Sequence, residues 1–305
     1  MARPPEFSGV VWIDGDATAY GMADRSHGIP NRVDTQFAIA SGTKGLTALT
    51  VVSLVEEGRL ALSTTARSVL GDDLPLVAGD VTVEHLLSHR SGIGDYFDEE
   101  LGVEVNPVPV QELATTEQYL AALAGYPAKF EAGERFAYCN SGFVLLGVIA
   151  ERASGVPFHD LVLQRVCEPA GMPDTAFLRS DELPARAARG YVVVDGHLRS
   201  NVFHVPARGH GDGGIYTTAA DVAALWDALY AGRIVSPAWV AEMTRPRSER
   251  YGLGFWLDTP RGVVRLEGAD AGVRFMSEHQ PSTGSTRTLI ANAAEGAREM
   301  WATPA

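Results

Sequence analysis

Residues 37–58 of the chain read Phe-Ala-Ile-Ala-Ser-Gly-Thr-Lys-Gly-Leu-Thr-Ala-Leu-Thr-Val-Val-Ser-Leu-Val-Glu-Glu-Gly. After Thr43 the apolar residues recur about every 3.6 positions, which predicts a helix that ends near Gly58. Ser41 stands just before this helix, and Lys44 follows three residues later. Because positions i and i+3 share one face of a helical turn, we expect the Ser41 hydroxyl and the Lys44 amine to touch.

A serine next to a lysine at the start of a helix is a candidate nucleophile with its base. A serine hydroxyl reacts poorly at neutral pH unless a base accepts its proton. Lys44 serves as that base only if burial and the positive helix N-terminus lower its pKa. The backbone N–H groups at the same terminus would also stabilise an oxyanion. Taken alone, Ser-x-x-Lys is more often structural, with the serine as an N-cap and the lysine in solvent.

The remaining sequence indicates one α/β (α+β) domain whose sheet uses both ends of the chain. Residues 8–21 predict a hairpin around the turn Asp14-Gly15. Further strands are predicted at residues 252–258, 262–266, 273–279 and 287–292. Short helices and Pro- or Gly-rich loops dominate the middle of the chain. We therefore expect an antiparallel sheet flanked by helices, with a mostly helical inserted lobe.

This prediction gives a single domain, residues 1–305, with two lobes. Residues 1–59 and 208–305 would form the α/β lobe, and residues 60–207 the mostly helical lobe. Ser41 would then lie in the cleft between the two lobes. The long polar loop predicted at residues 94–115 would form part of the rim of that cleft.

Composition and charge limit the partners and the compartment. The formal net charge of −13 argues against nucleic acid or an anionic membrane as a partner, because both require a basic face. The first residues contain no apolar signal segment, and the longest apolar runs are too short to span a bilayer. We expect a cytoplasmic location, with a removed leader as the alternative. Cys139 and Cys167 lack metal-like spacing, so we expect free, buried thiols and regard a disulfide as the less favoured alternative.

A second constellation follows at Tyr138-Cys139-Asn140. In an extended segment, residues two apart point the same way, so the phenol and the amide would face one site. A phenol near an ammonium ionises more easily and can act as a general base or relay a proton. The alternative for this tripeptide alone is a core tyrosine followed by an asparagine N-cap.

Together, Ser41-x-x-Lys44 and Tyr138-x-Asn140 resemble the motifs of the serine β-lactamase and penicillin-binding-protein superfamily. The chain is most similar to its class C β-lactamase-like branch of esterases, D-alanyl-D-amino-acid carboxypeptidases and D-aminopeptidases. The resemblance also covers the flanking segments 35–44, 81–92, 136–142 and 213–221, which occur in the family's order. It implies a β-lactamase/transpeptidase-like fold.

The resemblance implies a serine hydrolase that works through an acyl-enzyme. Ser41 would be the nucleophile, Lys44 its base partner, Tyr138 a second acid and base, and Asn140 a substrate-positioning residue. Whether Lys44 or Tyr138 accepts the serine proton stays open. The implied substrate is a small ester, an amide or a D-amino-acid peptide, and no metal or cofactor is expected. The alternatives are a true β-lactamase or D,D-carboxypeptidase, and a penicillin-binding-like sensor or scaffold without turnover.

The third motif of the superfamily, Lys-Thr-Gly or His-x-Gly, corresponds here to Glu267-Gly268-Ala269, followed by Asp270. The small residues would let a substrate approach the strand, and a backbone N–H near Asp270 would complete the oxyanion hole. Glu267 stands where the family has a cation, so we expect neutral or amine-bearing substrates to be favoured over carboxylates. Arg274 is a second candidate for the missing positive charge.

Four histidines are weaker candidates for the site. His85 and His89 are four residues apart on a predicted helix, as in some zinc sites, but no carboxylate partner accompanies them. We therefore expect both of them to be packing residues. His204 and His210 precede a glycine-rich turn and are candidates for the wall of the cleft.

Overall fold

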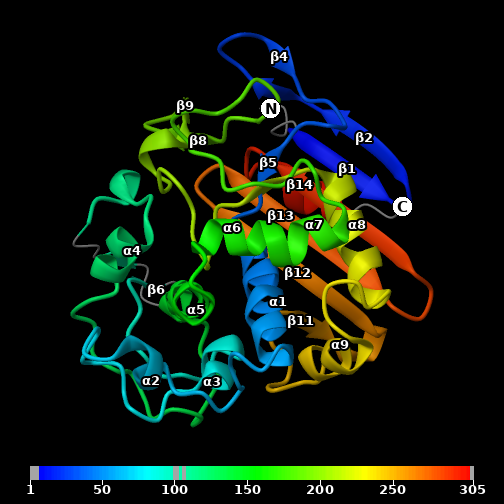
Figure 1. Ribbon diagram of the computed structural model, residues 1–305. Helices are drawn as coiled ribbons and strands as arrows, with labels where there is room; N and C mark the ends of the chain where they lie inside the picture. Colours follow the sequence, from blue (N-terminus) through cyan, green and yellow to red (C-terminus); the bar gives the residue numbers. More distant parts are fainter. Residues whose placement is uncertain (1–6, 99–102, 105–107, 303–305) are drawn as a thin grey trace.

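The computed structural model of the chain describes residues 7–98, 103–104 and 108–302. Within these residues the main sheet has six strands in the order β11-β12-β13-β14-β1-β2, with antiparallel neighbours. They are β1 (Gly9–Ile13), β2 (Asp16–Tyr20), β11 (Trp256–Asp258), β12 (Val263–Asp270), β13 (Val273–Gln280) and β14 (Ser285–Ala291). Because β1 pairs with β14, the two ends of the chain meet in one sheet, as predicted (Figure 1).

The N-terminal hairpin forms as its turn residues predict. Asp14 and Gly15 connect β1 to β2, and both have positive φ angles, 47° and 104°. Two positive φ angles characterise the hairpin turns whose twist matches that of the strands, and Asp-Gly is a preferred pair for them. Residues 1–6, which belong to the N-terminal stretch expected to lack a signal segment, lie outside the described residues.

Two strands differ in length from their predictions. Residues 252–255 are not part of β11, because Gly254 has φ +86° and passes so close to a helix that a Cβ would lie 2.2 Å from Ala48 Cβ. Strand β12 is longer than predicted and pairs with β13 as far as Asp270 opposite Val273. Gly268 and Ala269, which correspond to the third motif, are paired residues of this strand.

Helix α1 (Thr43–Glu56) follows a short 3₁₀ turn, η1 (Ala40–Gly42), and stops two residues before Gly58, whose φ is +79°. Residues 43–54 of α1 are all buried, so the helix is enclosed rather than amphipathic. Two of its hydroxyls bond within the helix: Thr50 donates to Leu46 O at 2.9 Å and Ser53 to Thr50 O at 2.7 Å. The hydroxyl of Thr47 instead donates to Gly211 O at 2.7 Å. Because these hydroxyls have hydrogen-bond partners, a helix with several hydroxyl groups is compatible with a buried position.

The other helices cover the sheet and surround α1. They are α2 (Ala66–Leu70), α3 (Val83–Leu87), α4 (Thr116–Ala122), α5 (Asn140–Ser154), α6 (Phe158–Val162), α7 (Glu168–Ala170), α8 (Ala219–Tyr230), α9 (Pro237–Met243) and α10 (Ala297–Ala302). Figure 1 shows α1 between the sheet and α5, with α8 against β14. No helix of the described chain combines the length and the apolar character that a bilayer crossing requires.

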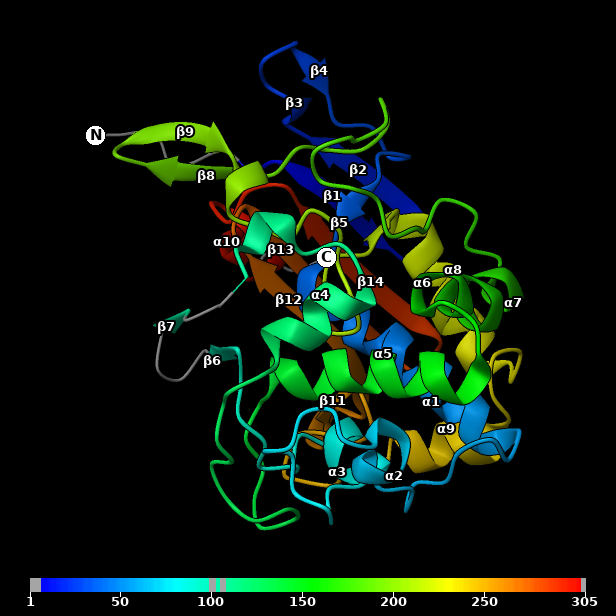
Figure 2. The same cartoon turned by 60° about the vertical axis from the view of Figure 1, so that its left-hand side comes forward.

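Short strand pairs complete the structure. They are β3 (Met22–Asp24) with β4 (Ile29–Pro30), β5 (Phe37–Ala38) with β10 (Tyr216–Thr217), β6 (Phe97–Asp98) with β7 (Val103–Glu104), and β8 (Tyr191–Val194) with β9 (His197–Ser200). The β8–β9 hairpin projects from the body of the molecule (Figure 2). Part of the predicted loop at 94–115 lies outside the described residues. The division of the domain into an α/β lobe and a mostly helical lobe, with boundaries after residues 59 and 207, stays a prediction.

Three buried or largely buried histidines are held neutral among aromatic rings. His210 is fully buried between Tyr119 and Phe158, whose ring centroids lie 4.9 and 4.7 Å away. Burial lowers the pKa of His210 and of His89 well below the usual value, and burial together with Arg208 lowers the pKa of His159 to about 4. An unfolded chain would protonate all three residues below pH ~6.5.

We therefore expect acid to destabilise the fold from pH ~6.5 downwards. Since the unfolded state binds more protons there, each neutral histidine contributes a slope of up to about 1.4 kcal/mol per pH unit to the free energy of unfolding. Urea unfolding of wild type and His210→Gln at a series of pH values measures this slope. For His210→Gln, the pH slope of the free energy of unfolding should be smaller than that of wild type by about the contribution of one histidine. His197→Gln, at an exposed position, should leave the slope unchanged. Equal slopes for wild type and His210→Gln would contradict the assignment.

Candidate active site

Ser41 lies in the η1 turn, directly before α1. The preceding residue, Ala40, has φ +44°, an uncommon conformation for a residue with a side chain. Strand β12 passes very close to this turn, since a Cβ on Gly268 would lie 2.1 Å from Ile39 O and 2.9 Å from Ser41 N. A glycine at position 268 is therefore required for the strand to reach the backbone of Ser41.

Lys44 connects three parts of the site. Its Nζ lies 3.0 Å from Ser41 Oγ, 2.8 Å from Asn140 Oδ1 and 2.6 Å from the main-chain oxygen of Asp212. The Lys44 side chain is only 2% exposed, so the ammonium group is buried beneath Ser41 rather than solvated. The contact predicted from the i,i+3 spacing is present, and the solvated-lysine alternative is wrong.

Tyr138 and Asn140 lie on the same side of Lys44. Asn140 is the first residue of α5, and its amide nitrogen donates to Phe97 O at 3.0 Å. The Lys44 Nζ lies 4.9 Å from the centroid of the Tyr138 ring, which stacks on Trp256 at 6.1 Å. The structure thus brings Ser41, Lys44, Tyr138 and Asn140 together.

Residues 95–97 hold this arrangement in place, although they carry no motif in the sequence. Helix α5 has no capping side chain of its own at Cys139. Asp95 supplies the cap: its carboxylate accepts from the N–H groups of Asn140 at 2.9 Å and Ser141 at 2.8 Å. Tyr96 donates its hydroxyl to Asp212 Oδ2 at 2.5 Å. A helix start without its own N-cap is the sequence signal that would have suggested such a distant carboxylate.

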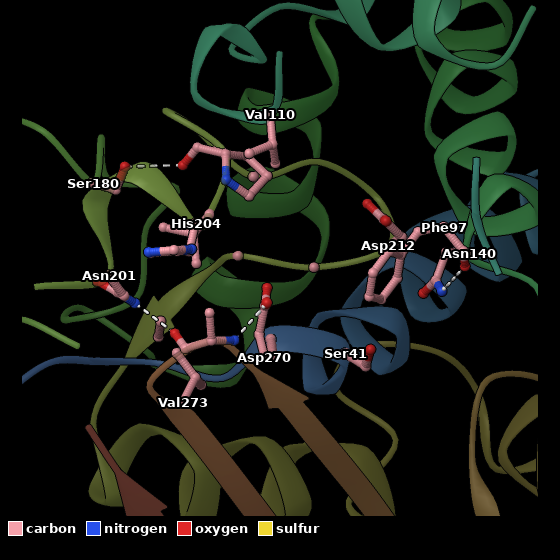
Figure 3. A pocket seen from close by; sticks show the side chains of 18 of the residues that line it. Ser41, Phe97, Val110, Asn140, Ser180, Asn201, His204, Asp212, Asp270 and Val273 are labelled. Carbon is pink, nitrogen blue, oxygen red and sulfur yellow. Dashed lines mark hydrogen bonds between the residues drawn. The ribbon is translucent and has the colours of Figure 1, made fainter. Parts of the chain in front are cut away.

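A pocket of about 650 Å³ opens above Ser41. Its wall includes Ser41, Tyr96, Tyr119, Asn140, Ser180, Asn201, His204, Asp212, Ala269, Asp270 and Val273. Figure 3 shows Ser41 and Asn140 towards one end, Asn201 and His204 towards the other, and Asp270 between them. His204 therefore contributes to the wall as the sequence suggested, whereas His210 is buried outside it.

Glu267 and Arg274 are not brought into the pocket, in contrast to the sequence-based expectation. Successive residues of a strand face opposite sides, and Gly268 faces the Ser41 turn. The side chain of Glu267 accordingly faces away, where its carboxylate lies 3.3 Å from Arg265 Nη1. Arg274 pairs in register with Ala269 and so shares the face of Glu267. This placement follows from the alternation of side chains along β12, which its register with β13 fixes.

Asp212 is the deepest charged group of the pocket wall, with 9% of its surface exposed. Burial raises the pKa of its carboxyl group, although the Lys44 ammonium and the Tyr96 hydroxyl act in the opposite direction. Burial and the charge of Asp212 also raise the pKa of Tyr96 well above its usual value. Tyr96 is therefore a hydrogen-bond donor to Asp212 rather than a phenolate.

His85 and His89, the remaining two candidate histidines, have separate structural roles. His85 Nδ1 accepts from Thr82 N–H at 3.3 Å in a capping box at the start of α3. His89 Nδ1 accepts from Cys139 N–H at 3.1 Å, and its ring lies 4.4 Å from that of Tyr138. Both side chains thus pack and cap, as expected. No group of three or more potential metal ligands occurs within residues 7–98, 103–104 and 108–302.

Comparison with known proteins establishes the family. A family model described as Beta-lactamase matches residues 6–296 of the chain. The chain belongs to the Beta-lactamase family. Esterase EstB of Burkholderia gladioli, a relative in this family, is 31% identical over 256 residues, which cover 74% of this chain and 65% of the esterase. The chain thus spans slightly less than two thirds of that relative's length.

Solved structures support the same Beta-lactamase family fold. The penicillin-binding protein from Bacillus halodurans has a TM-score of 0.88 at 34% identity, covering 97% of this chain and 94% of that chain. The D-amino acid amidase from Ochrobactrum anthropi SV3, complexed with L-phenylalanine amide, has a TM-score of 0.77 at 26% identity, covering 95% and 87%. The predicted superfamily and the α/β fold class are confirmed. An esterase and a D-amino acid amidase are thus among the proteins that this chain resembles.

Proposed function

We propose that the chain hydrolyses a small ester or amide through an acyl-enzyme on Ser41. The single observation that supports this most is the contact of 3.0 Å between Ser41 Oγ and the buried Lys44 Nζ, at the edge of a pocket. A nucleophile and its base must lie within hydrogen-bond distance, and this pair does. Relatives of this chain include both an esterase and an amidase, which is why both substrate classes are retained.

In this proposal the hydroxyl of Ser41 attacks the substrate carbonyl carbon. A neutral Lys44 amine accepts the hydroxyl proton across the contact of 3.0 Å, and the tetrahedral oxyanion is stabilised by the Ser41 N–H and an N–H of β12. Gly268 supports the second donor, because its lack of a side chain brings β12 against the Ser41 backbone. Tyr138, next to Lys44, gives its phenolic proton to the leaving group and regains one from the protonated Lys44. A water molecule then attacks the acyl carbon and gives its proton to the same pair, which returns it to Ser41 Oγ as the ester bond to the serine breaks.

Asn140 is the proposed substrate-positioning residue. Its side-chain oxygen accepts from Lys44 at 2.8 Å and its nitrogen donates to Phe97 O, so both ends of the amide are oriented. Asn140 also lines the pocket next to Ser41. An amide held at this point can orient Lys44 and contact a substrate carbonyl at the same time.

A fluorophosphonate probe read by intact mass tests the proposal. We expect one covalent adduct, located at Ser41 by peptide mapping, together with steady release of product from short-chain 4-nitrophenyl esters. A fluorescent penicillin in parallel distinguishes the alternatives. Stable labelling at Ser41 without turnover of any ester would indicate the sensor, and rapid turnover of the penicillin would indicate a β-lactamase. Labelling of another residue, or none, would contradict Ser41 as the nucleophile.

A further inference from the structure

His89 binds the backbone on both sides of Tyr138. Its main-chain oxygen accepts from the N–H of Ala137 at 2.9 Å, and its Nδ1 accepts from the N–H of Cys139 at 3.1 Å. One residue thus holds the two amides that flank Tyr138, the first with its backbone and the second with its side chain. These two bonds fix the Tyr138 peptide against the segment that follows α3.

The imidazole ring of His89 also supports the Tyr138 ring. The two ring centroids lie 4.4 Å apart, with 34° between the ring planes. Three further rings enclose the imidazole at centroid distances of 5.8, 4.8 and 4.8 Å, those of Phe136, Phe143 and Tyr251. His89 is 1% exposed, so the imidazole is close-packed and has little room to rotate. The phenol of Tyr138 therefore rests on a ring that other side chains hold in place.

Packing alone does not account for a histidine at position 89. Because Nδ1 accepts a hydrogen bond, the proton of the neutral ring lies on Nε2. This Nε2 is buried and has no hydrogen-bond partner among the residues that the structure describes, which is unfavourable. A phenylalanine would fill the same space without a buried polar group. What a phenylalanine could not supply is the Nδ1 acceptor for Cys139 N–H.

The orientation of Tyr138 matters because this residue adjoins Lys44. The Lys44 Nζ lies 4.9 Å from the centroid of the Tyr138 ring. In the proposed mechanism Tyr138 gives its proton to the leaving group and regains one from Lys44, and both transfers require hydrogen-bond distances. A displacement of about 1 Å is enough to slow such a step strongly.

We propose that His89 is a positioning residue of the reaction, which binds the amides on both sides of Tyr138 and so directs its phenol towards the leaving group. This inference rests on the proposed hydrolase function. His89 itself exchanges no proton: burial and then the charge of Lys44 hold its pKa well below the usual value, so Nδ1 stays an acceptor. A displaced Tyr138 should impair leaving groups that need a proton and spare those that depart as stable anions.

Two esters with the same acyl group test the inference, benzyl butyrate and 4-nitrophenyl butyrate. The benzyl alkoxide must receive a proton as it leaves, whereas 4-nitrophenolate is a stable anion. Both esters give the same butyryl-enzyme, so their kcat/KM values differ only through binding and the leaving-group step. We expect His89→Phe to lower the benzyl to 4-nitrophenyl ratio of kcat/KM about 10-fold or more, a part of what a general acid contributes. This ratio does not depend on the folded fraction, so partial unfolding does not imitate the effect.

His89→Asn is the conservative variant. The Oδ1 of asparagine lies close to the place of Nδ1, and asparagine accepts the φ of +55° found at this position. This variant should keep the wild-type ratio, although loss of the ring lowers its stability. His89→Gln, whose acceptor is one carbon farther from the backbone, should behave as His89→Phe and replaces that variant if it does not fold.

His85→Phe is the matched control. The Nδ1 of His85 also accepts a backbone N–H, that of Thr82 at 3.3 Å, but this bond belongs to the capping box of α3. The substitution removes the same kind of hydrogen bond from a residue four positions earlier. It should lower the stability of the fold and leave the ratio of the two esters unchanged.

Combining His89→Phe with Tyr138→Phe decides whether His89 acts through the phenol. Tyr138→Phe alone should lower the ratio, and adding His89→Phe should lower it no further. The inference is overturned if His89→Phe leaves the ratio unchanged, if His89→Asn lowers it equally, or if the effects of the two substitutions multiply. It is also overturned if wild type hydrolyses only the 4-nitrophenyl ester, because no acid then serves the leaving group. If neither ester is hydrolysed, the hydrolase proposal fails with it, and fluorophosphonate labelling of Ser41 then separates a sensor from a wrongly assigned nucleophile.

Discussion

Replacing Ser41 with alanine is expected to reduce ester hydrolysis by about 10⁴-fold or more, the magnitude found when a catalytic serine is removed. The physical reason is that the Lys44 amine then has no hydroxyl to deprotonate, while the pocket still binds substrate. Steady-state kinetics with a short-chain 4-nitrophenyl ester measures the loss. Because Ser41 is only partly buried and lies in the turn before α1, the thermal unfolding midpoint should change little.

Ser53→Ala is the matched control for this experiment. Ser53 lies on the same helix, and its hydroxyl donates to Thr50 O at 2.7 Å, away from the pocket. The variant removes one hydroxyl from α1 without touching the site, so its activity should stay close to that of wild type. If Ser41→Ala retained a tenth of the wild-type kcat/KM, the acyl-enzyme proposal would be untenable.

Replacing Lys44 with methionine is expected to reduce kcat/KM by about 10²-fold or more, the usual contribution of a positioned acid or base. Methionine occupies a similar volume but offers neither a proton acceptor for Ser41 nor a donor for Asn140 and Asp212 O. The measurement is kcat/KM as a function of pH, with circular dichroism to verify the fold. Activity within threefold of wild type would exclude Lys44 as the base.

Tyr138→Phe provides the comparison that separates the two candidate bases. The phenylalanine ring keeps the stacking on Trp256 and the position over Lys44, so only the hydroxyl is lost. If Lys44 accepts the serine proton, Tyr138→Phe retains the acidic limb of the pH profile and Lys44→Met loses it. The reverse pattern would assign the base to Tyr138, which answers the question that the motifs leave open.

Much of the fold could be predicted because its signals are short-range. The turn Asp14-Gly15 requires positive φ angles, and the chain supplies two residues that accept them. The apolar period after Thr43 predicts α1 correctly, although the hydroxyls of Thr43 and Thr47 bond to residues 215 and 211, far away in the sequence. Strand β12 was predicted to end at Leu266, whereas its pairing with β13 continues to Asp270.

In the candidate site, too, the contacts between residues close in sequence could be predicted and the long-range contacts could not be predicted from local patterns. Ser41 and Lys44 meet because three residues make almost one helical turn, a local geometry that the spacing alone determines. Their connection to Asn140 depends on packing between α1 and α5, and only the family resemblance anticipated it. Asp95 and Tyr96 carry no local motif, since each acts on a group at least 45 positions away.

The amino-acid sequence by itself was sufficient for the family, the sheet built from both chain ends, and the Ser41–Lys44 pair. These features follow from local periodicity, turn chemistry and motif order, which do not require knowledge of distant contacts. The charge of the pocket was established only by the tertiary structure. Strand register turns Glu267 towards Arg265 and Asp270 into the pocket, and the packing of a separate turn adds Asp212. A single step of register exchanges the two faces of a strand, so the sign of a pocket cannot be derived from the residues before their pairing is known.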